Sequence, residues 1–164
     1  MEEKARAMVL ASFAADSLAL GAHWIYSTEK ISRNFGRIET LLDPAAASYH
    51  PTKKQGEFTH YGDQAFVLLE SLASRGRFDP EDFSQRWQQL FRDYTGYFDQ
   101  ATKDTLKNIS RGGDPLQAGS SSNDISGAAR IAPVIYCLRH DEVELLKAVR
   151  TQTAMTHKDP LTID

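Results

Sequence analysis

Apolar residues in this chain recur at the three- and four-residue spacing of an amphipathic helix, and no stretch alternates polar and apolar residues as a half-buried strand does. The clearest case follows Asp79, which is suited to cap a helix that begins at Pro80 and carries Phe83 and Trp87 on one face. Comparable patterns predict helices over residues 4–23, 63–75, 99–109, 126–138 and 141–153. The sequence therefore predicts an all-α protein of several short helices packed around one core.

Residues 27–61 interrupt this pattern, because proline and glycine are scattered through them and the helical period fades. We expect a long irregular segment with one short helix at most. Irregular segments of this length in a compact domain are usually functional or mobile. A second break, over residues 111–122, predicts a flexible polar loop.

Length and charge limit the classes of protein that the chain can represent. Its 164 residues suit one domain, and we expect 1–164 to form it. The formal net charge of -3 comes without a lysine or arginine cluster, which argues against nucleic acid as the main partner and against a membrane surface. No uninterrupted apolar run approaches the roughly 20 residues of a membrane span, so a cytoplasmic location is expected. Cys137 is the single cysteine and lies in an apolar run, which indicates a buried thiol.

Two carboxylates lie at positions that either a functional role or a structural role could explain. Asp16 lies inside an alanine-rich helix, where a buried acid needs a partner and an exposed one does not; both interpretations are open. Asp63 lies at the start of a predicted helix, where the helix dipole alone explains an acid. The spacing of Asp63 from other residues does not by itself specify a metal site.

The second half of the chain carries weaker signals. His157 precedes Asp159 by two residues and could form an acid/base pair, although an isolated histidine near a proline is more often structural. The glycines and serines within 112–122 could cradle a phosphate, but they match no known phosphate-binding fingerprint. Arg130 could reach a ligand phosphate or pair with Asp124, and the structural pairing is favoured.

Taken in chain order, four segments resemble motifs of the ADP-ribosylglycohydrolase family, which includes the J1-crystallins. Residues 14–19 resemble the family's G-D-A-L-G, and residues 61–65 stand where it has Y-T-D-D-T. Residues 126–133 resemble G-N-G-A-A-M-R-I-A-P, and residues 156–160 resemble T-H-x-D-P. The resemblance implies a compact orthogonal multi-helix bundle of which this chain is the N-terminal portion. Such a bundle would be completed by a C-terminal segment or by a second copy of the chain.

The resemblance also implies a site. Its catalytic residues would be Asp16, Asp63 and Asp124, and its magnesium ligands would be Asp63 and Gln64. Residues for binding ADP-ribose or an ADP-ribosylated substrate would be Ser121, Ser122, Asn123, Ser126 and His157.

This sequence departs from the family pattern at the metal motif, and the departures leave two functions open. Gly62 and Gln64 replace the threonine and the second aspartate, and His23 stands where a glutamate often follows the first motif. One hypothesis is a magnesium-dependent hydrolase of the glycosidic bond in an ADP-ribosylated substrate. The alternative is a catalytically impaired ADP-ribose-binding protein, or a structural protein like the J1-crystallins.

Overall fold

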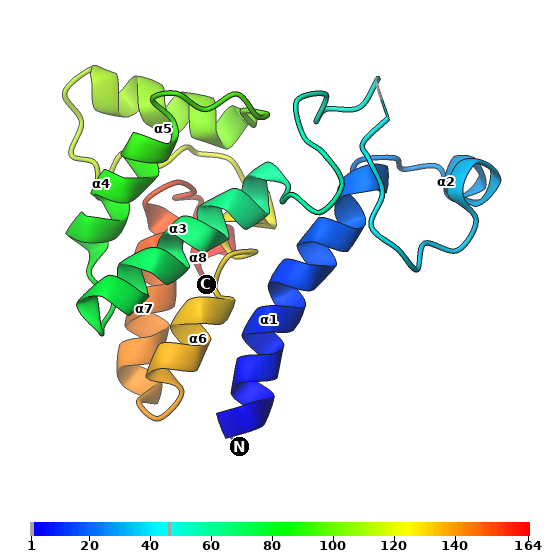
Figure 1. Ribbon diagram of the computed structural model, residues 1–164. Helices are drawn as coiled ribbons and strands as arrows, with labels where there is room; N and C mark the ends of the chain where they lie inside the picture. The colour runs from blue at the N-terminus through cyan, green and yellow to red at the C-terminus, as the bar shows by residue number, and fades with distance from the viewer. Residues whose placement is uncertain (1, 46) are drawn as a thin grey trace. The chain divides into compact units, whose positions relative to one another are not determined.

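A computed structural model describes residues 2–45 and 47–164, and within them the chain is helical, without strands (Figure 1). An isolated bridge joins Ser120 to His157. The all-α prediction is therefore confirmed. The α-helices are α1 (Glu2–Ala19), α2 (Thr28–Phe35), α3 (His60–Arg75), α4 (Pro80–Leu90), α5 (Gln100–Ser110), α6 (Ala132–Leu138), α7 (Glu142–Ala154) and α8 (Pro160–Ile163), and two 3-10 turns are η1 (Leu20–Ala22) and η2 (Ile125–Gly127).

The chain forms two compact units. The first runs up to Asp63 and includes Thr95–Tyr97, and the second contains Gln64–Tyr94 and Phe98–Asp164. Helix α3 begins in the first unit and continues into the second. The candidate residues are divided between the units: Asp16 and Asp63 belong to the first, and Gln64, residues 121–126 and His157 belong to the second.

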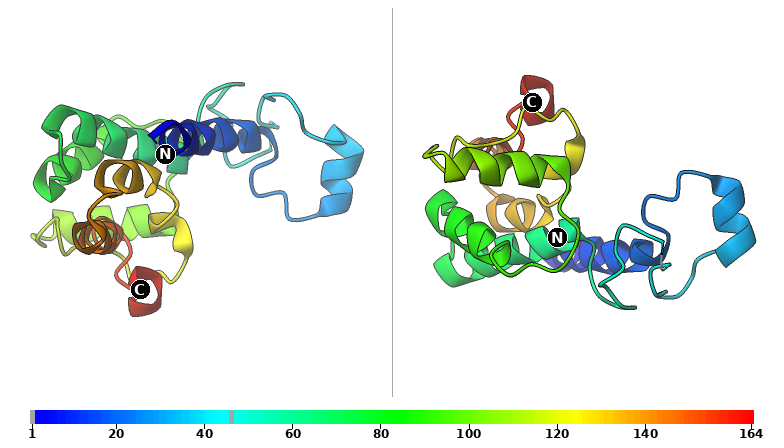
Figure 2. Two further views of the ribbon diagram at one scale, coloured as in Figure 1. Left: turned by 90° about the horizontal axis from the view of Figure 1, so that it is seen from below. Right: turned by 90° about the horizontal axis from the view of Figure 1, so that it is seen from above.

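In the first unit, α1 leads into the irregular segment that the sequence predicted. The chain runs from the end of α1 out to α2 and returns to the start of α3 (Figures 1 and 2). The irregular segment that leads back to α3 is held against α1 by two contacts. The Ser17 hydroxyl donates to the carbonyl of Glu57 at 2.9 Å, and the ring centroids of Phe13 and Phe58 lie 5.4 Å apart. These contacts hold residues 57–60 beside the last turns of α1.

Residues Glu2–Ala22 are also long and apolar enough to cross a membrane, judged by length and composition alone. The core helix of a soluble protein and a signal sequence near an N-terminus pass the same test. Both carboxylate oxygens of Asp16, within this helix, accept hydrogen bonds from Thr59. Such pairing of an acid with the protein's own backbone is typical of a helix that packs against its own chain.

The second unit has an apolar core built from α3, α4, α6 and α7. Its buried members are Val67, Leu68, Leu72, Phe83, Trp87, Phe91, Val134, Ala148 and Met155. Helices α6 and α7 pack against each other, and both views of Figure 2 show them side by side. Capping aspartates fix where several helices begin, since Asp79, Asp99 and Asp141 each accept a hydrogen bond from a backbone N–H in the first turn.

Two local predictions are wrong. The helix expected from Ser126 to Leu138 is divided into η2 and α6, which begins only at Ala132. Pro133 explains the late start, because a proline lacks the N–H group needed further inside a helix but fits its first turn. Cys137 is exposed rather than buried; the buried residues of α6, Pro133 and Val134, lie in its first turn, whereas Cys137 lies in its last turn.

Candidate functional site

In the first unit, Asp16 binds Thr59, the residue that precedes α3 and whose hydroxyl accepts from the backbone N–H of Tyr61. The Oδ2 atom of Asp16 accepts from the Thr59 backbone N–H at 2.8 Å, and its Oδ1 atom accepts from the Thr59 hydroxyl at 2.6 Å. Gly62 makes this approach possible, because a Cβ atom at residue 62 would lie 2.2 Å from Oδ2 of Asp16. Burial raises the pKa of Asp16, and the Asp63 carboxylate adds to the rise, while the hydrogen bonds from Thr59 only partly offset it. Asp16 is thus a partnered acid, and the interpretation as an exposed residue is excluded.

Asp63, one turn further along α3, faces a cation from its own chain. The Lys53 ammonium lies 2.6 Å from its Oδ2 atom, and the two side chains are only 12% and 17% exposed. An ion pair at this distance, shielded from solvent, gives Asp63 the positive neighbour that a metal ion would otherwise supply.

A cluster of three histidines lies beside these acids in the first unit. His23 follows η1, His50 belongs to the irregular segment, and His60 is the first residue of α3. One ring nitrogen of each lies within 4.8 Å of the others, and Nδ1 of His23 is 2.7 Å from Nε2 of His50. Burial lowers the pKa of both His23 and His50 to about 4, so these rings are neutral at pH 7.

The sequence singled out His23 only as a replacement for the family's glutamate, and nothing in the sequence linked it to His50 or His60. The spacing of the three residues follows no metal-ligand motif, and His50 lies in a segment without periodicity. The available signal was the number of histidines in this part of the chain. Three of the five histidines in the chain, His23, His50 and His60, lie within or close to residues 27–61.

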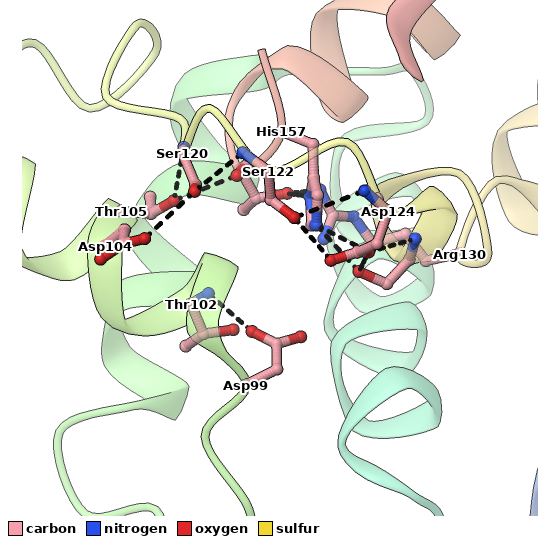
Figure 3. A network of polar contacts seen from close by, with 12 residues as sticks. Asp99, Thr102, Asp104, Thr105, Ser120, Ser122, Asp124, Arg130 and His157 are labelled. Atoms are coloured by element: carbon pink, nitrogen blue, oxygen red, sulfur yellow. Dashed lines mark hydrogen bonds and ion pairs between the residues drawn. The ribbon is translucent and has the colours of Figure 1, made fainter. Parts of the chain in front are cut away.

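In the second unit Asp124 and His157, which the resemblance assigns to one site, lie side by side (Figure 3), and Ser126 contacts both. The Ser126 hydroxyl lies 2.8 Å from Nε2 of His157 and also contacts Oδ1 of Asp124. The same Asp124 oxygen lies 3.2 Å from Nε2 of His157. His157 is 3% exposed, whereas the side chain of Asp124 is 51% exposed, so a buried ring supports a carboxylate that solvent can reach.

The contacts of His157 favour one tautomer, because the Asp124 carboxylate 3.2 Å from Nε2 can only accept a hydrogen bond. Arg130 donates to the Thr156 hydroxyl oxygen at 2.6 Å, which leaves the hydroxyl proton available for Nδ1 of His157 at 3.0 Å. In this arrangement the ring proton is on Nε2, which donates toward Ser126 and Asp124. The group therefore differs from a nucleophilic triad, in which the histidine accepts the serine proton. Ser126 instead donates to Asp124 and holds it in place.

Asp124 is kept ionised by its neighbours. Partial burial pushes its pKa upward, but the hydrogen bonds from Ser126 and Ser122 outweigh this effect and His157 adds to them, so the pKa lies below its usual range. The Ser122 hydroxyl donates to Oδ2 of Asp124 at 2.7 Å. Of the predicted ligand-binding residues, Ser121 and Asn123 are exposed and Ser122 is half-buried.

The loop that carries these residues is anchored at its base. The backbone N–H of Ser120 donates to Thr156 at 2.9 Å, and the backbone N–H of Lys158 donates to Ser120 at 2.8 Å. Gly119 permits this approach, because a Cβ atom there would lie 2.2 Å from the carbonyl oxygen of Ala154. The loop therefore begins from a fixed point beside His157.

Arg130 and Gln64 are buried partners within the second unit. Oε1 of Gln64 accepts from Arg130 at 3.1 Å and from the indole of Trp87 at 2.7 Å. Arg130 also donates to the side chain and the carbonyl of Gln152, both at 2.8 Å. Burial lowers the pKa of Arg130 to about 10, which leaves it charged at pH 7. Arg130 therefore has a structural role, as favoured, but within the described residues its hydrogen bonds go to Gln64, Gln152 and Thr156 rather than to Asp124.

The fold and the two groups of polar residues define an all-α protein with a candidate ligand site on a helix-anchored loop. The sequence matches the model of the ADP-ribosylglycohydrolase family over residues 1–164. The chain belongs to this family.

Individual relatives agree with this assignment. The chain is 29% identical over 135 residues to an uncharacterised protein of Archaeoglobus fulgidus, covering 82% of this chain and 43% of that protein. It is 24% identical over 148 residues to crystallin J1A of Tripedalia cystophora, covering 82% of this chain and 46% of the crystallin. The chain thus spans about half the length of the curated relatives it matches.

A solved structure shares the fold. A chain described as an ADP-ribosylglycohydrolase-related protein complex superposes with a TM-score of 0.76 at 22% identity, covering 99% of this chain and 52% of that one. The expected fold type is therefore confirmed, and it corresponds to about half of the solved chain.

Proposed function

We propose that this chain binds the ADP-ribose part of an ADP-ribosylated substrate through the loop Ser121–Ser126. The observation that carries the proposal is the group formed by Asp124, Ser126 and His157, in which a buried ring and a hydroxyl hold an exposed carboxylate. A fixed carboxylate can accept hydrogen bonds from the hydroxyls of a ribose. Exposed Ser121 and Asn123 add hydroxyl and amide donors that suit the phosphates or the ribose.

The proposed reaction is hydrolysis of the glycosidic bond to this ribose. Positive charge develops on the ribose as such a bond breaks, and an ionised Asp124 would stabilise it. Membership of the family supports this chemistry.

Magnesium, which the resemblance implied, does not fit the oxygen atoms as they are arranged. Magnesium needs about six oxygen ligands in an octahedron. Oδ2 of Asp63 is paired with Lys53, Oε1 of Gln64 accepts two hydrogen bonds, and both oxygens of Asp16 accept from Thr59. No step of the proposed reaction therefore depends on magnesium.

A second candidate function is binding without catalysis, or a structural role. Two observations favour it: the similarity to crystallins J1A and J1B of Tripedalia cystophora, and the Lys53–Asp63 ion pair. Under either function we propose a cytoplasmic protein whose partner is a small molecule.

Calorimetric titration with ADP-ribose tests the proposal on the purified chain and on Ser126→Ala, with Ser110→Ala as a control at an exposed position. We expect the original chain to bind ADP-ribose. Ser126→Ala should weaken binding about tenfold, because it removes one to two hydrogen bonds to a charged group, and Ser110→Ala should leave binding unchanged. The absence of binding, or equal binding by the original chain and by Ser126→Ala, would overturn the proposal.

Release of free ADP-ribose from an ADP-ribosylated protein then separates the two candidates. Turnover that Asp124→Asn abolishes supports the hydrolase. Binding without turnover supports the second function. Repeating the titration with and without magnesium tests the conclusion that the metal is not required.

A further inference from the structure

The histidine cluster of the first unit has the composition of a transition-metal site. Three imidazoles converge from three separate segments, and His50 and His60 are fully buried while His23 is half-buried. Neutral imidazole nitrogen is a preferred ligand of zinc, nickel and copper, whereas magnesium and calcium prefer oxygen. The donors available here therefore select a different class of metal from the one that the family resemblance implied.

The distances are close to those of a metal site. Two imidazole nitrogens bound to one zinc ion at about 2.0–2.1 Å in a tetrahedron lie roughly 3.3 Å apart. One nitrogen of each ring is already within 4.8 Å of the others, and the His23–His50 pair is at 2.7 Å. Side-chain rotations that move these nitrogens by about 1 Å would equalise the three distances.

A buried polar atom in the cluster calls for an explanation. Nδ1 of His50 is shielded from solvent and has no hydrogen-bond partner among residues 2–45 and 47–164. An unsatisfied buried nitrogen costs about 1–3 kcal/mol, so such atoms usually engage a proton donor, a water molecule or an ion. A metal bound by His50 would draw the ring into a position where its nitrogens are used.

Aromatic rings enclose the cluster, and one side opens to a pocket. Trp24 stacks on His23 with centroids 4.7 Å apart, and Tyr97 meets the edge of His60 at 5.3 Å. Trp24 is held at a φ of 63°, a left-handed conformation that a tryptophan adopts only where its surroundings enforce it. A pocket of about 490 Å³ is lined by His23, Trp24 and Tyr49. The pocket reaches the cluster at His23.

We propose that His23, His50 and His60 bind one divalent transition-metal ion of the zinc class, with a fourth coordination position open toward the pocket beside His23. Three histidines with one open position are the arrangement of catalytic zinc sites, whereas structural sites close all four positions with protein ligands. A ligand that enters this pocket with an anionic or carbonyl oxygen could take the fourth position. Residues outside the ADP-ribose loop form this site, so its test is separate from that of the proposed function.

Cobalt(II) is the probe for the test, because its visible absorption reports four-coordinate geometry, and zinc then competes for the same position. The purified chain is stripped with a chelator and titrated with each metal. We expect one cobalt ion per chain, visible bands of a tetrahedral or five-coordinate complex, and displacement by one equivalent of zinc. We also expect zinc at a hundredfold excess over its dissociation constant to raise the unfolding temperature by about 5–10 °C.

Variants assign the ligands. His23→Asn, at the least buried of the three positions, should weaken zinc binding at least a hundredfold, and His60→Asn should do the same. His140→Asn, at an exposed histidine of the second unit, is the control and should bind as the original chain does. Circular dichroism of each metal-free variant checks that it folds. Absence of binding by the folded original chain, or binding that the His23 variant retains, would overturn the proposal.

Discussion

Gly62 and Asp16 lie so close that a Cβ atom on Gly62 would be 2.2 Å from the carboxylate oxygen Oδ2. The family resemblance places a threonine at residue 62, so the glycine and the hydrogen bonds between Asp16 and Thr59 belong together. A side chain at residue 62 would have to expel the carboxylate from Thr59. Gly62 thus provides the space that the hydrogen bonds between Asp16 and Thr59 require.

We expect Gly62→Thr to destabilise the protein by about 1–3 kcal/mol, because it overpacks the contact and displaces the hydrogen bonds to Thr59. Ala73→Thr, at an exposed position of the same helix, measures the cost of threonine in a helix alone, about 0.7 kcal/mol or less. Urea unfolding of both variants checks the difference. Equal losses would show that Asp16 does not depend on the space at Gly62.

Arg130 connects three segments of the second unit through Gln64, Gln152 and Thr156. Replacing it with alanine leaves several buried acceptors without a donor. We expect Arg130→Ala to lower the free energy of unfolding by about 3–5 kcal/mol. The control is Arg150→Ala, whose ion pair with Asp164 is solvent-exposed and should cost at most about 1 kcal/mol. A small effect at both positions, measured by denaturant unfolding, would contradict this view of Arg130.

Asp82 should contribute stability that depends on pH. Burial pushes its pKa upward, but hydrogen bonds from Ser71, Arg86 and Arg75 outweigh this, so its pKa is lower in the folded chain than in the unfolded one. A lowered pKa means that the stabilisation is complete above the unfolded value of about 3.9 and is lost as the pH falls through the folded value.

We therefore expect Asp82→Asn to cost about 2–4 kcal/mol at pH 7, and the difference from the original chain to shrink as the pH falls below about 4. Thermal unfolding between pH 7 and pH 2.5 provides the measurement. Asp93→Asn, at an exposed aspartate, serves as the matched control and should change little. A difference that stays constant over the whole range would argue against a charged Asp82.

Local rules were enough to predict most of the fold. Asp79 and Asp141 cap their helices as expected, because a capping side chain acts on the backbone two or three residues away. The buried face of α3 was harder to predict. Sequence analysis of a periodic helix favours faces with large apolar residues, yet Phe66 is 44% exposed and Gln64 is 3% exposed. Gln64 is buried because its amide meets Arg130, 66 residues away in the sequence.

The candidate sites show the same limit. Asp124, Ser126 and His157 were expected together through the family resemblance, and they do meet in the structure. The histidine cluster was not expected, because His50 reaches His23 across 27 residues of irregular chain. The course of such a segment depends on local features such as the left-handed backbone conformation of Trp24, which no periodic sequence pattern predicts.

The Lys53 ammonium lies 2.6 Å from Oδ2 of Asp63, the carboxylate that the family resemblance assigns to magnesium. Removing this cation should leave Asp63 with a carboxylate oxygen and a net negative charge to offer to magnesium. We expect Lys53→Met, which keeps most of the apolar stem, to raise magnesium affinity at least tenfold over the original chain in calorimetric titrations. Lys54→Met, at the neighbouring exposed lysine, is the control for a general change in charge.

The double variant Lys53→Met with Asp63→Asn separates competition at Asp63 from any other effect. If Lys53 acts as the competitor, the gain in magnesium affinity disappears in the double variant, because the carboxylate that it uncovered is gone. A gain that survives the loss of Asp63 would place the magnesium elsewhere, and equal affinity in all variants would show that the ion pair does not exclude the metal. The result thus decides whether the ion pair is what prevents magnesium from binding at the position that the family resemblance assigned to it.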